Sequence, residues 1–440
     1  AGLLGFRRLS ESLGETHWYL GMLRDSSAAG ERLCSILSSS RFITDLLEVS
    51  PEATAWLDTD KNLVPMTFDA QWQEIRSKMS RHPKPQEAMR LIRLIRRREM
   101  LRIALADSAC LLTQEEVGHA LADVDRAAVL GALHVAEGAV LENEEKLTDM
   151  LVVAMGRQGG REIGYGSDAD VLYVHRALPG AEPGAAQSQA ERIVGQLSAL
   201  LQQPCTPAIL AEKVLVLDAG LRPEGRNGPL VRSLGSYREY YSRWSLIWEA
   251  QALLRARPMA GSDELAEDFI DLIDPIRYSA GISEPDIREI RRIKARVENE
   301  RLPRGADPSR QLKLGRGALS DVEWLVQLLQ LEHAGTHPEL RTTATLPALD
   351  AVAAAGLLPA ADAAILRDAW LLASRIRSAN VIRGGRNPDV LPSSRRELEA
   401  VARWCGYGPG QGGVLEEDYL RITRRSRAVF EGWFYGYNDS

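Results

Sequence analysis

Lysine and cysteine are both scarce in this 440-residue chain, and long apolar runs are missing from it. Only seven of its 54 basic residues are lysine, so each lysine stands out as a candidate for a specific role. The four cysteines, Cys34, Cys110, Cys205 and Cys405, lie far apart and form no CxxC or Cys/His pattern of the zinc type. We therefore expect reduced thiols in a cytoplasmic protein.

The apolar pattern and the charge exclude two classes of protein. No run reaches the ~18 residues of a membrane-spanning helix, and no signal peptide opens the sequence. The net charge of −6 lacks the basic surplus of a protein that binds nucleic acid stably. At roughly 100–200 residues per domain, the length predicts two to four domains. Because the sequence starts at Ala1 and runs at once into helix-like residues, we expect a piece of something longer.

Helical periodicity dominates the first part of the chain. Apolar residues at helical spacing predict helices over 7–24, 29–48 and 67–80. The segment 86–106 carries arginines opposite its apolar stripe. Such a face either grips a phosphate-rich partner or, more commonly, is solvated or salt-bridged. A capping box is predicted at 113–116, where Thr is followed three residues later by Glu.

The middle of the chain is rich in β-forming residues. Runs at 151–155 and 169–174 predict two strands around a glycine-rich, hairpin-like segment, followed by a helix over 187–203 and a strand over 213–218. This order is the core of a small mixed sheet. We therefore predict an α+β fold, in which a small mixed sheet is embedded in a predominantly helical chain that ends in a helical bundle.

The glycine-rich segment, GRQGGREIGYGSDAD over 156–170, ends with two aspartates, and a third follows at 218. Asp168 and Asp170 are two residues apart on a predicted strand, so their carboxylates point to the same face. Asp218 ends the later strand and completes a set of three acids if the two strands are neighbours. Two bare carboxylates about 5 Å apart repel by ~3 kcal/mol at an effective dielectric constant of 20. Cations are therefore expected between them, and oxygen ligands suit Mg²⁺.

Charge balance indicates how the site is completed. Three carboxylates and a nucleoside triphosphate approach neutrality with two Mg²⁺ ions and nearby basic groups. The candidate phosphate-binding residues are Arg157, Gly159, Gly160, Gly166, Ser167, Lys213 and Arg222. A lone DxD or a lone glycine turn is usually structural, but the combination favours a two-metal site for nucleotidyl transfer.

These segments resemble the polymerase-β-like nucleotidyltransferases and, within them, the glutamine synthetase adenylyltransferases. The resemblance lies in 156–170, in LDAGLRPEG over 217–225 and in KLGRGALSDVEWLVQ over 313–327, and it extends over nearly the whole chain. It implies that the chain transfers AMP from ATP to a tyrosine of glutamine synthetase and so down-regulates that enzyme in nitrogen control. It also implies regulation by a PII-type signalling protein and by glutamine.

The family joins two such halves in one longer enzyme, of which one attaches AMP and the other removes it. The GYGSD loop and the FYG-type chain end resemble the adenylylating half. The AMP-removing half, and a module that senses ATP without transferring AMP, are the alternatives. On this reading the chain divides into a helical region over 1–110, a nucleotidyltransferase domain over 111–258 and a helical bundle over 259–440.

Several positions depart from the pattern of the family. Arg157 stands where the family usually has lysine, and Gly220 stands where it usually has arginine, which leaves Arg222 as the expected cation. Asp321 either reaches the site or caps its own helix. The aromatic residues between 237 and 248 either contact glutamine synthetase or belong to the core.

Overall fold

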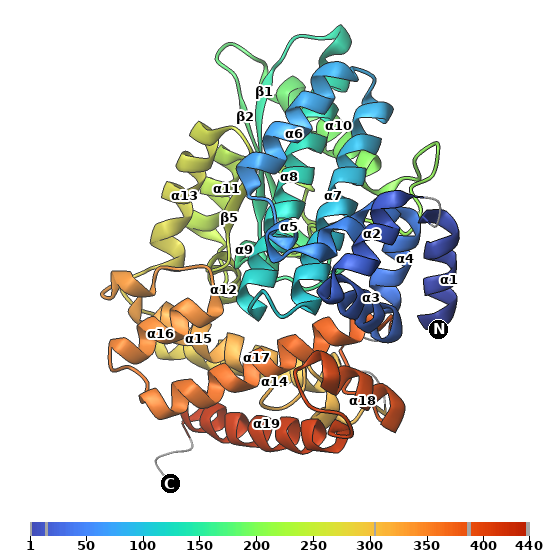
Figure 1. Ribbon diagram of the computed structural model, residues 1–440. Coiled ribbons are helices and arrows are strands. Elements are labelled where there is room, and N and C mark those ends of the chain that lie inside the picture. Colours follow the sequence, from blue (N-terminus) through green and yellow to red (C-terminus); the bar gives the residue numbers. More distant parts are fainter. Residues whose placement is uncertain (1, 14–15, 303–304, 385–388, 437–440) are drawn as a thin grey trace.

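The computed structural model describes residues 2–13, 16–302, 305–384 and 389–436. A mixed sheet with helices on both faces occupies the upper part of the view in Figure 1, and a layer of C-terminal helices lies below it. The predicted α+β class, with a small sheet in a mainly helical chain, is confirmed. Within the described ranges, no helix has both the length and the apolar character needed to cross a membrane.

Five strands form the sheet. They are β1 (Thr148–Ala154), β2 (Ala169–Ala177), β3 (Leu217–Asp218), β4 (Val231–Ser233) and β5 (Arg257–Gly261). Strand β1 lies between β2 and β5 and is antiparallel to both. The short strands β3 and β4 both run parallel to β2, at successive positions along its other edge. Strand β2 is therefore central, and its first residues are next to β3.

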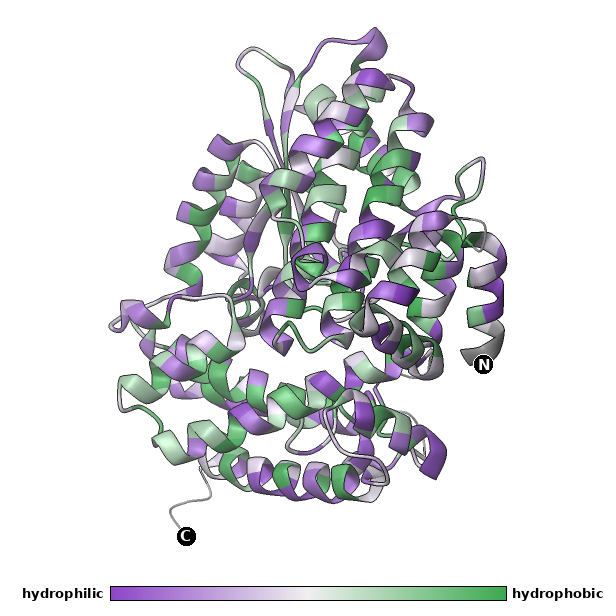
Figure 2. Cartoon of the chain, in the orientation of Figure 1, coloured by the Kyte–Doolittle hydropathy of each residue, from purple (hydrophilic) through white to green (hydrophobic). Residues whose placement is uncertain are grey.

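Alternation along the strands supplies two apolar faces, because successive side chains of a strand point to opposite sides. Met150 and Val152 of β1 belong to the core under one set of helices, whereas Leu151 and Val153 belong to the core under the other set. The first set is α7 (Pro85–Ser108), α8 (Gln114–Val140) and α10 (Pro183–Gln202). The second set is α11 (Leu234–Arg243) and α13 (Asp263–Arg277). In Figure 2 the apolar sides of these helices are turned inward.

Short helices precede the sheet. They are α1 (Gly2–Leu13), α2 (His17–Asp25), α3 (Ser27–Ser39), α4 (Arg41–Val49), α5 (Asp60–Leu63) and α6 (Phe68–Arg81). The helices predicted over 7–24 and 29–48 are each two helices, and the second breaks because the Ser40 hydroxyl caps α4 by accepting the Ile43 N–H at 3.0 Å. The helix predicted over 67–80 and the capping box at 113–116 are confirmed.

The arginine face of α7 is engaged within the protein, so the salt-bridged interpretation is correct. Arg93 pairs with Glu212 at 2.6 Å, and Arg96 donates to the backbone carbonyl of Lys213. Of the strand predicted over 213–218, only Leu217–Asp218 forms, so the rest of that prediction is wrong.

The C-terminal helices make the lower layer. They are α12 (Ile247–Leu253), α14 (Glu284–Glu300), α15 (Leu319–His333), α16 (Thr345–Ala354), α17 (Ala360–Arg383), α18 (Arg395–Trp404) and α19 (Gly412–Tyr435). Their shared core includes Trp370, Phe430 and Phe434. Helix α17 also reaches the N-terminal helices, because the Ser40 hydroxyl donates to the Ile382 carbonyl at 2.8 Å. The division at 110 and 258 stays a prediction.

Short turns of helix complete the described structure. A four-residue helix, α9 (Gly156–Gly159), follows β1 directly. The 3₁₀ helices are Pro51–Asp58, Leu141–Asn143, Gly225–Asn227, Pro308–Arg310 and Pro338–Leu340.

Candidate active site

The carboxylates of Asp170 and Asp218 come from neighbouring parallel strands at the same level. The register of β2 and β3 pairs Asp170 with Asp218 directly. Asp168 precedes β2 by one residue and is exposed, whereas Asp170 and Asp218 are half-buried. The topology thus brings together the three aspartates that the sequence pattern singled out, at the edge of the sheet where β2 begins.

Burial and neighbouring negative charge act together on Asp170. Burial raises the pKa of Asp170 to about 6; Lys313 opposes this rise, while Asp218 and Asp168 add to it. The carboxylates are therefore close enough to destabilise each other's charge. The exposed Lys313, from the helical layer, offsets part of that repulsion.

A glycine makes room for Asp170. Gly156 has a φ of +51°, and a Cβ at this position would lie 2.4 Å from the Asp170 Oδ2 atom. Only glycine satisfies both the left-handed backbone and the close approach without strain. Gly156 thus fixes the position of the Asp170 carboxylate.

The carboxylate oxygens of the three aspartates are the type of ligand that suits a divalent cation. Carboxylate oxygens are the ligands that Mg²⁺ prefers, and the raised pKa of Asp170 marks negative charge that a cation would offset. One oxygen of Asp218 already accepts the Gly220 N–H at 2.8 Å, which leaves its second oxygen for another partner. Over the described ranges, no group of three or more His, Cys, Asp or Glu side chains is gathered so as to hold a metal ion. The two Mg²⁺ ions stay a prediction.

The loop over 164–167 closes on itself just before Asp168. The Ser167 hydroxyl accepts the Gly164 N–H at 3.2 Å, and the Ser167 N–H donates to the Gly164 carbonyl at 3.1 Å. Gly166 has a φ of +67°, and a Cβ there would lie 2.3 Å from the Lys213 Cε atom. Lys213 therefore covers Gly166, so two predicted phosphate-binding residues are adjacent.

The other predicted phosphate-binding glycines have packing roles. A Cβ on Gly159 would lie 1.7 Å from the Arg255 carbonyl oxygen, and a Cβ on Gly160 would lie 2.8 Å from the Thr343 carbonyl oxygen. Both positions therefore require glycine because another backbone is close. Their contact with phosphate stays a prediction.

The two predicted arginines donate to backbone carbonyls. Arg157 Nε donates to the Glu162 carbonyl at 2.8 Å, and its guanidinium lies over the Trp370 ring of α17. Arg222 donates to the carbonyls of Ala219 and Gly228, at 2.9 and 3.0 Å, and so closes the turn that follows Asp218.

Asp321 lies in a buried ion cluster of the helical layer. Its carboxylate accepts hydrogen bonds from Lys294 at 2.6 Å and from Arg427 at 2.9 Å. It also accepts the Gly317 N–H at 2.6 Å, which stabilises the start of α15. Neither of the two roles considered for Asp321 is shown, because the N-cap of α15 is Ala318 and no side chain of the described residues caps this helix. The cluster fixes the loop that carries Lys313.

Lys313 is a site residue that reasoning from the residues did not assign. It lies within electrostatic range of Asp170 although 143 positions separate them. The backbone around it is held by the Ser320 N–H, which donates to the Lys313 carbonyl at 3.0 Å. The available signal was the scarcity of lysine together with the glycine-rich KLGRG segment.

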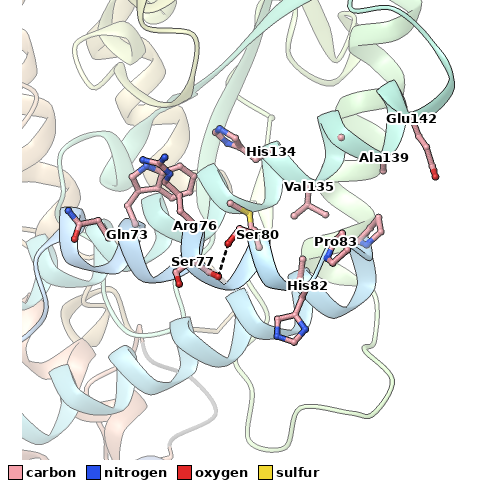
Figure 3. Close-up of a pocket in the computed structure, with 15 residues that line it drawn as sticks. Gln73, Arg76, Ser77, Ser80, His82, Pro83, His134, Val135, Ala139 and Glu142 are labelled. Atoms are coloured by element: carbon pink, nitrogen blue, oxygen red, sulfur yellow. Dashed lines mark hydrogen bonds between the residues drawn. The ribbon is translucent and has the colours of Figure 1, made fainter.

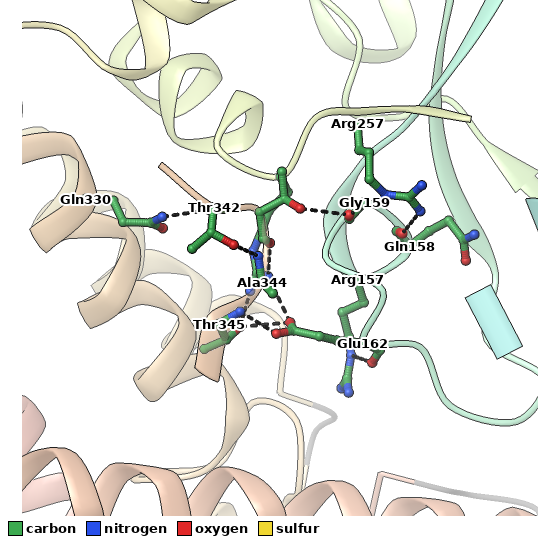
Figure 4. A network of polar contacts seen from close by, with 11 residues as sticks. Arg157, Gln158, Gly159, Glu162, Arg257, Gln330, Thr342, Ala344 and Thr345 are labelled. Atoms are coloured by element: carbon green, nitrogen blue, oxygen red, sulfur yellow. Dashed lines mark hydrogen bonds and ion pairs between the residues drawn. The ribbon is translucent and has the colours of Figure 1, made fainter. Parts of the chain in front are cut away.

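A buried polar network joins the glycine-rich segment to the helical layer (Figure 4). Glu162 pairs with Arg255 at 2.8 Å and accepts the Thr345 hydroxyl at 2.8 Å. Arg255 also donates to the Thr343 carbonyl at 2.6 Å, and the Thr343 hydroxyl donates to the Gly159 carbonyl at 3.1 Å. In this view Arg157 Nε donates to the Glu162 carbonyl, and the end of the guanidinium points away from Gly159 and Thr345.

A cleft of about 500 Å³ lies between the sheet edge and the helical layer. Gly156 and Gly220, which contact the carboxylates, line one side of it. The other side is formed by α12, α14 and α15, with Trp248, Gln251, Arg255, Arg296, Arg301, Trp324 and Gln327 among its residues. None of the three aspartates lines the cleft itself, but it offers aromatic and basic groups beside the two glycines that adjoin Asp170 and Asp218.

The aromatic residues between 237 and 248 divide between the core and the surface. Tyr237 and Tyr241 are buried in the core against α13, as the core interpretation predicted. Trp248 lines the cleft, and Trp244 is 68% exposed. Contact of these two with glutamine synthetase stays a prediction.

A larger pocket of about 870 Å³ lies between α6 and α8 (Figure 3). Arg76, His134 and Glu142 are among its polar residues. None of its lining residues belongs to the loops that carry the three aspartates.

Comparisons with known proteins agree with this architecture. The family model for glutamate-ammonia ligase adenylyltransferase matches residues 30–271, which is more than half of the chain. The model for GlnD PII-uridylyltransferase matches residues 290–434.

Curated relatives are similar over nearly the whole of this chain. Relatives from Leifsonia xyli subsp. xyli, Streptomyces avermitilis and Mycobacterium tuberculosis H37Rv are 50%, 49% and 46% identical over 99%, 99% and 97% of it. Each is named a bifunctional glutamine synthetase adenylyltransferase/adenylyl-removing enzyme, and the alignments cover 42%, 45% and 43% of their lengths. The chain thus spans less than half the length of these relatives. It belongs to the glutamate-ammonia ligase adenylyltransferase family.

Proposed function

We propose that this chain is a nucleotidyltransferase that transfers AMP from ATP to a tyrosine of glutamine synthetase. The observation that carries the proposal is the pairing of Asp170 with Asp218 on neighbouring parallel strands, with Asp168 two residues before Asp170. The printed names of the relatives support the choice of glutamine synthetase as the protein substrate.

The chemistry follows from the carboxylates. Asp168 and Asp170 would hold both Mg²⁺ ions and Asp218 one of them, and the bound ions would neutralise charge on the carboxylates and the triphosphate. The free oxygen of Asp218 accepts the proton of the tyrosine hydroxyl. The phenolic oxygen then bonds to the α-phosphorus, and the bond to the bridging oxygen of pyrophosphate breaks in line with it.

The cleft and the lysines supply binding and orientation. A volume of about 500 Å³ is within the range of small-molecule sites, so one nucleotide fits beside the aspartates. Lys213 at Gly166 and Lys313 near Asp170 provide positive charge where pyrophosphate is released.

The test uses radiolabelled ATP, Mg²⁺ and unmodified glutamine synthetase. Wild-type chain should label the synthetase, whereas the double variant Asp168→Asn/Asp170→Asn should lose transfer by more than about 1,000-fold with an unchanged circular dichroism spectrum. Asp149→Asn, in the neighbouring strand β1, is the matched control and should keep transfer. Near-normal transfer by the double variant would show that the site is assigned wrongly.

AMP removal is the second candidate, because the names of the relatives include an adenylyl-removing activity. The same assay separates the two: modified synthetase incubated with the chain and inorganic phosphate should stay modified if this is the attaching half. Release of nucleotide would identify the removing half. Bound ATP with neither reaction would identify a nucleotide-sensing module.

We also propose control of the transfer by a PII-type protein and by glutamine, in a cytoplasmic setting where glutamine synthetase is the partner. The match of residues 290–434 to a PII-uridylyltransferase model supports the helical layer as the regulated part. Adding a purified PII protein or glutamine to the transfer assay should change the rate. An identical rate with and without both would remove this part of the proposal.

A further inference from the structure

A small cavity lies behind the 164–167 loop, between that loop and α17. Its volume is about 80 Å³, and none of the three aspartates lines it. The polar residues around this loop cavity are Gln114, Arg157, Ser167, Ser374, Arg377 and Ser378. The space holds a few waters or one small polyatomic ion but is too small for a nucleoside.

Three polar atoms at the loop cavity lack a protein partner within the described structure. They are the Ser374 hydroxyl, Arg157 Nη1 and Gln114 Oε1. Ser374 is only 2% exposed, and a helical serine normally bonds to a carbonyl of the preceding turn or reaches solvent. Two of these groups are donors, and buried donors are nearly always satisfied. A ligand with acceptor oxygens would satisfy both of these donors.

The two charged side chains that line the loop cavity are both positive. Arg157 and Arg377 both line it, and burial together with Arg377 lowers the pKa of Arg157 to about 10. Asp389 accepts a hydrogen bond from Arg377 Nε at 2.6 Å and compensates that side of the pair. Arg157 has a carbonyl and the Trp370 ring as its contacts. A guanidinium in these surroundings favours an anion.

We propose that the loop cavity is a binding site for a phosphate group, held by Arg157, Arg377 and Ser374. Its oxygens accept hydrogen bonds from the two guanidinium groups and the Ser374 hydroxyl. The group is either free inorganic phosphate or a phosphate of a bound nucleotide that reaches behind the loop. Occupation ties the loop that leads into Asp168 to α17. Binding is measured directly, so the test does not depend on AMP transfer.

The experiment is calorimetric titration of the whole chain with inorganic phosphate in a phosphate-free buffer. Wild type should bind one phosphate per chain. Ser374→Ala should weaken binding about threefold by removing one hydrogen bond, and Arg377→Met about tenfold by removing a charged one. Ser426→Ala is the matched control, because Ser426 is also a fully buried helical serine with an unpartnered hydroxyl but does not line the cavity.

A second titration distinguishes the two sources of phosphate. If a non-hydrolysable ATP analogue abolishes phosphate binding and Ser374→Ala weakens binding of that analogue, a nucleotide phosphate occupies the site. If phosphate and analogue bind together, the site takes free phosphate. Absence of phosphate binding to wild type, or equal affinities of the Ser374→Ala and Ser426→Ala variants, would overturn the proposal. Because Ser374→Ala removes only an unpartnered hydroxyl, the test stands even if Arg377→Met does not fold.

Discussion

Glu162 and Arg255 form an ion pair at 2.8 Å, with 6% of each side chain exposed. Glu162 lies within the glycine-rich segment, and Arg255 precedes β5, so the pair joins two loops at the end of the sheet. Both residues also bond to Thr345 at the start of α16. The pair therefore sets the position of the helical layer relative to the three aspartates.

Replacement of Glu162 by glutamine should destabilise the fold. The substitution leaves the Arg255 charge buried without its counter-ion, and breaking a buried pair in this way costs about 3–5 kcal/mol. Thermal unfolding should show a clearly lower midpoint. Glu289→Gln, which removes an exposed pair with Arg292, should leave the midpoint unchanged. Equal midpoints for both variants would contradict the structural role of Glu162.

Gly156→Ala should reduce AMP transfer more than it reduces stability. The new Cβ would lie 2.4 Å from the Asp170 carboxylate, and the backbone has a φ of +51°. Moving a reacting group by about 1 Å can lower the rate about 100-fold, whereas the left-handed backbone costs an alanine about 1–2 kcal/mol. Transfer rates and urea unfolding curves measure the two effects.

The control for Gly156 is Gly138→Ala on α8, where a Cβ meets nothing within 4 Å. This substitution should keep the rate and slightly raise stability, since alanine favours helices. If Gly156→Ala keeps full activity, the carboxylate of Asp170 does not need its observed position.

The relative positions of the aspartates could be predicted from the sequence because short segments carried the pattern. Asp168 immediately precedes β2 and Asp170 lies on it, and the terminal position of Asp218 predicted its place beside Asp170, which the register confirms. The prediction of a long strand before Asp218 was wrong. Alternation of apolar residues reports only on the local sequence, whereas the contacts of this stretch with the arginines of α7 come from residues far away in the chain. The spacing of apolar residues does not reveal which backbone carbonyls accept hydrogen bonds from an arginine elsewhere in the chain.

Residues brought together by tertiary packing were harder to predict. Lys313 approaches Asp170 from another layer, and the pair of Glu162 with Arg255 spans 93 positions. The same limit applies to Arg157, whose Nε donates to the Glu162 carbonyl and whose guanidinium lies over the Trp370 ring of α17, while its predicted phosphate contact stays a prediction. Residue type indicates what chemistry is possible, while packing decides which groups meet.

Lys313→Met should lower transfer without unfolding the protein. The side chain is exposed, so its loss removes charge near Asp170 but little packing. We expect kcat/KM to fall about tenfold, which corresponds to about 1.4 kcal/mol of transition-state stabilisation. Lys313→Arg should restore most of the rate. Arg316→Met, an exposed cation on the same loop, is the control and should keep the wild-type rate. Equal losses in both methionine variants would indicate a general effect of charge.

Asp170→Asn should stabilise the metal-free protein, increasingly so as the pH rises. The pKa of Asp170 is about 6 in the folded chain, against 3.8 for an unperturbed aspartate. The folded state therefore holds this proton more tightly, and wild type loses stability as the pH rises from about 4 to 6. The difference corresponds to about 3 kcal/mol above pH 6.

Asparagine stays neutral at every pH, so the Asp170→Asn variant should not lose folding stability in this way as the pH rises. Unfolding free energies from urea titrations in EDTA, at pH 4.5 and 7.5, measure the gap between Asp170→Asn and wild type. The gap should be about 1 kcal/mol at pH 4.5 and reach about 3 kcal/mol at pH 7.5. Asp58→Asn, which changes an exposed carboxylate that is not among the charges acting on Asp170, should show little gap at either pH. A gap for Asp170→Asn that does not change with pH would mean that its carboxylate is not held at a raised pKa. The cluster would then not be short of positive charge, and the argument for cations at these three aspartates would lose its electrostatic basis.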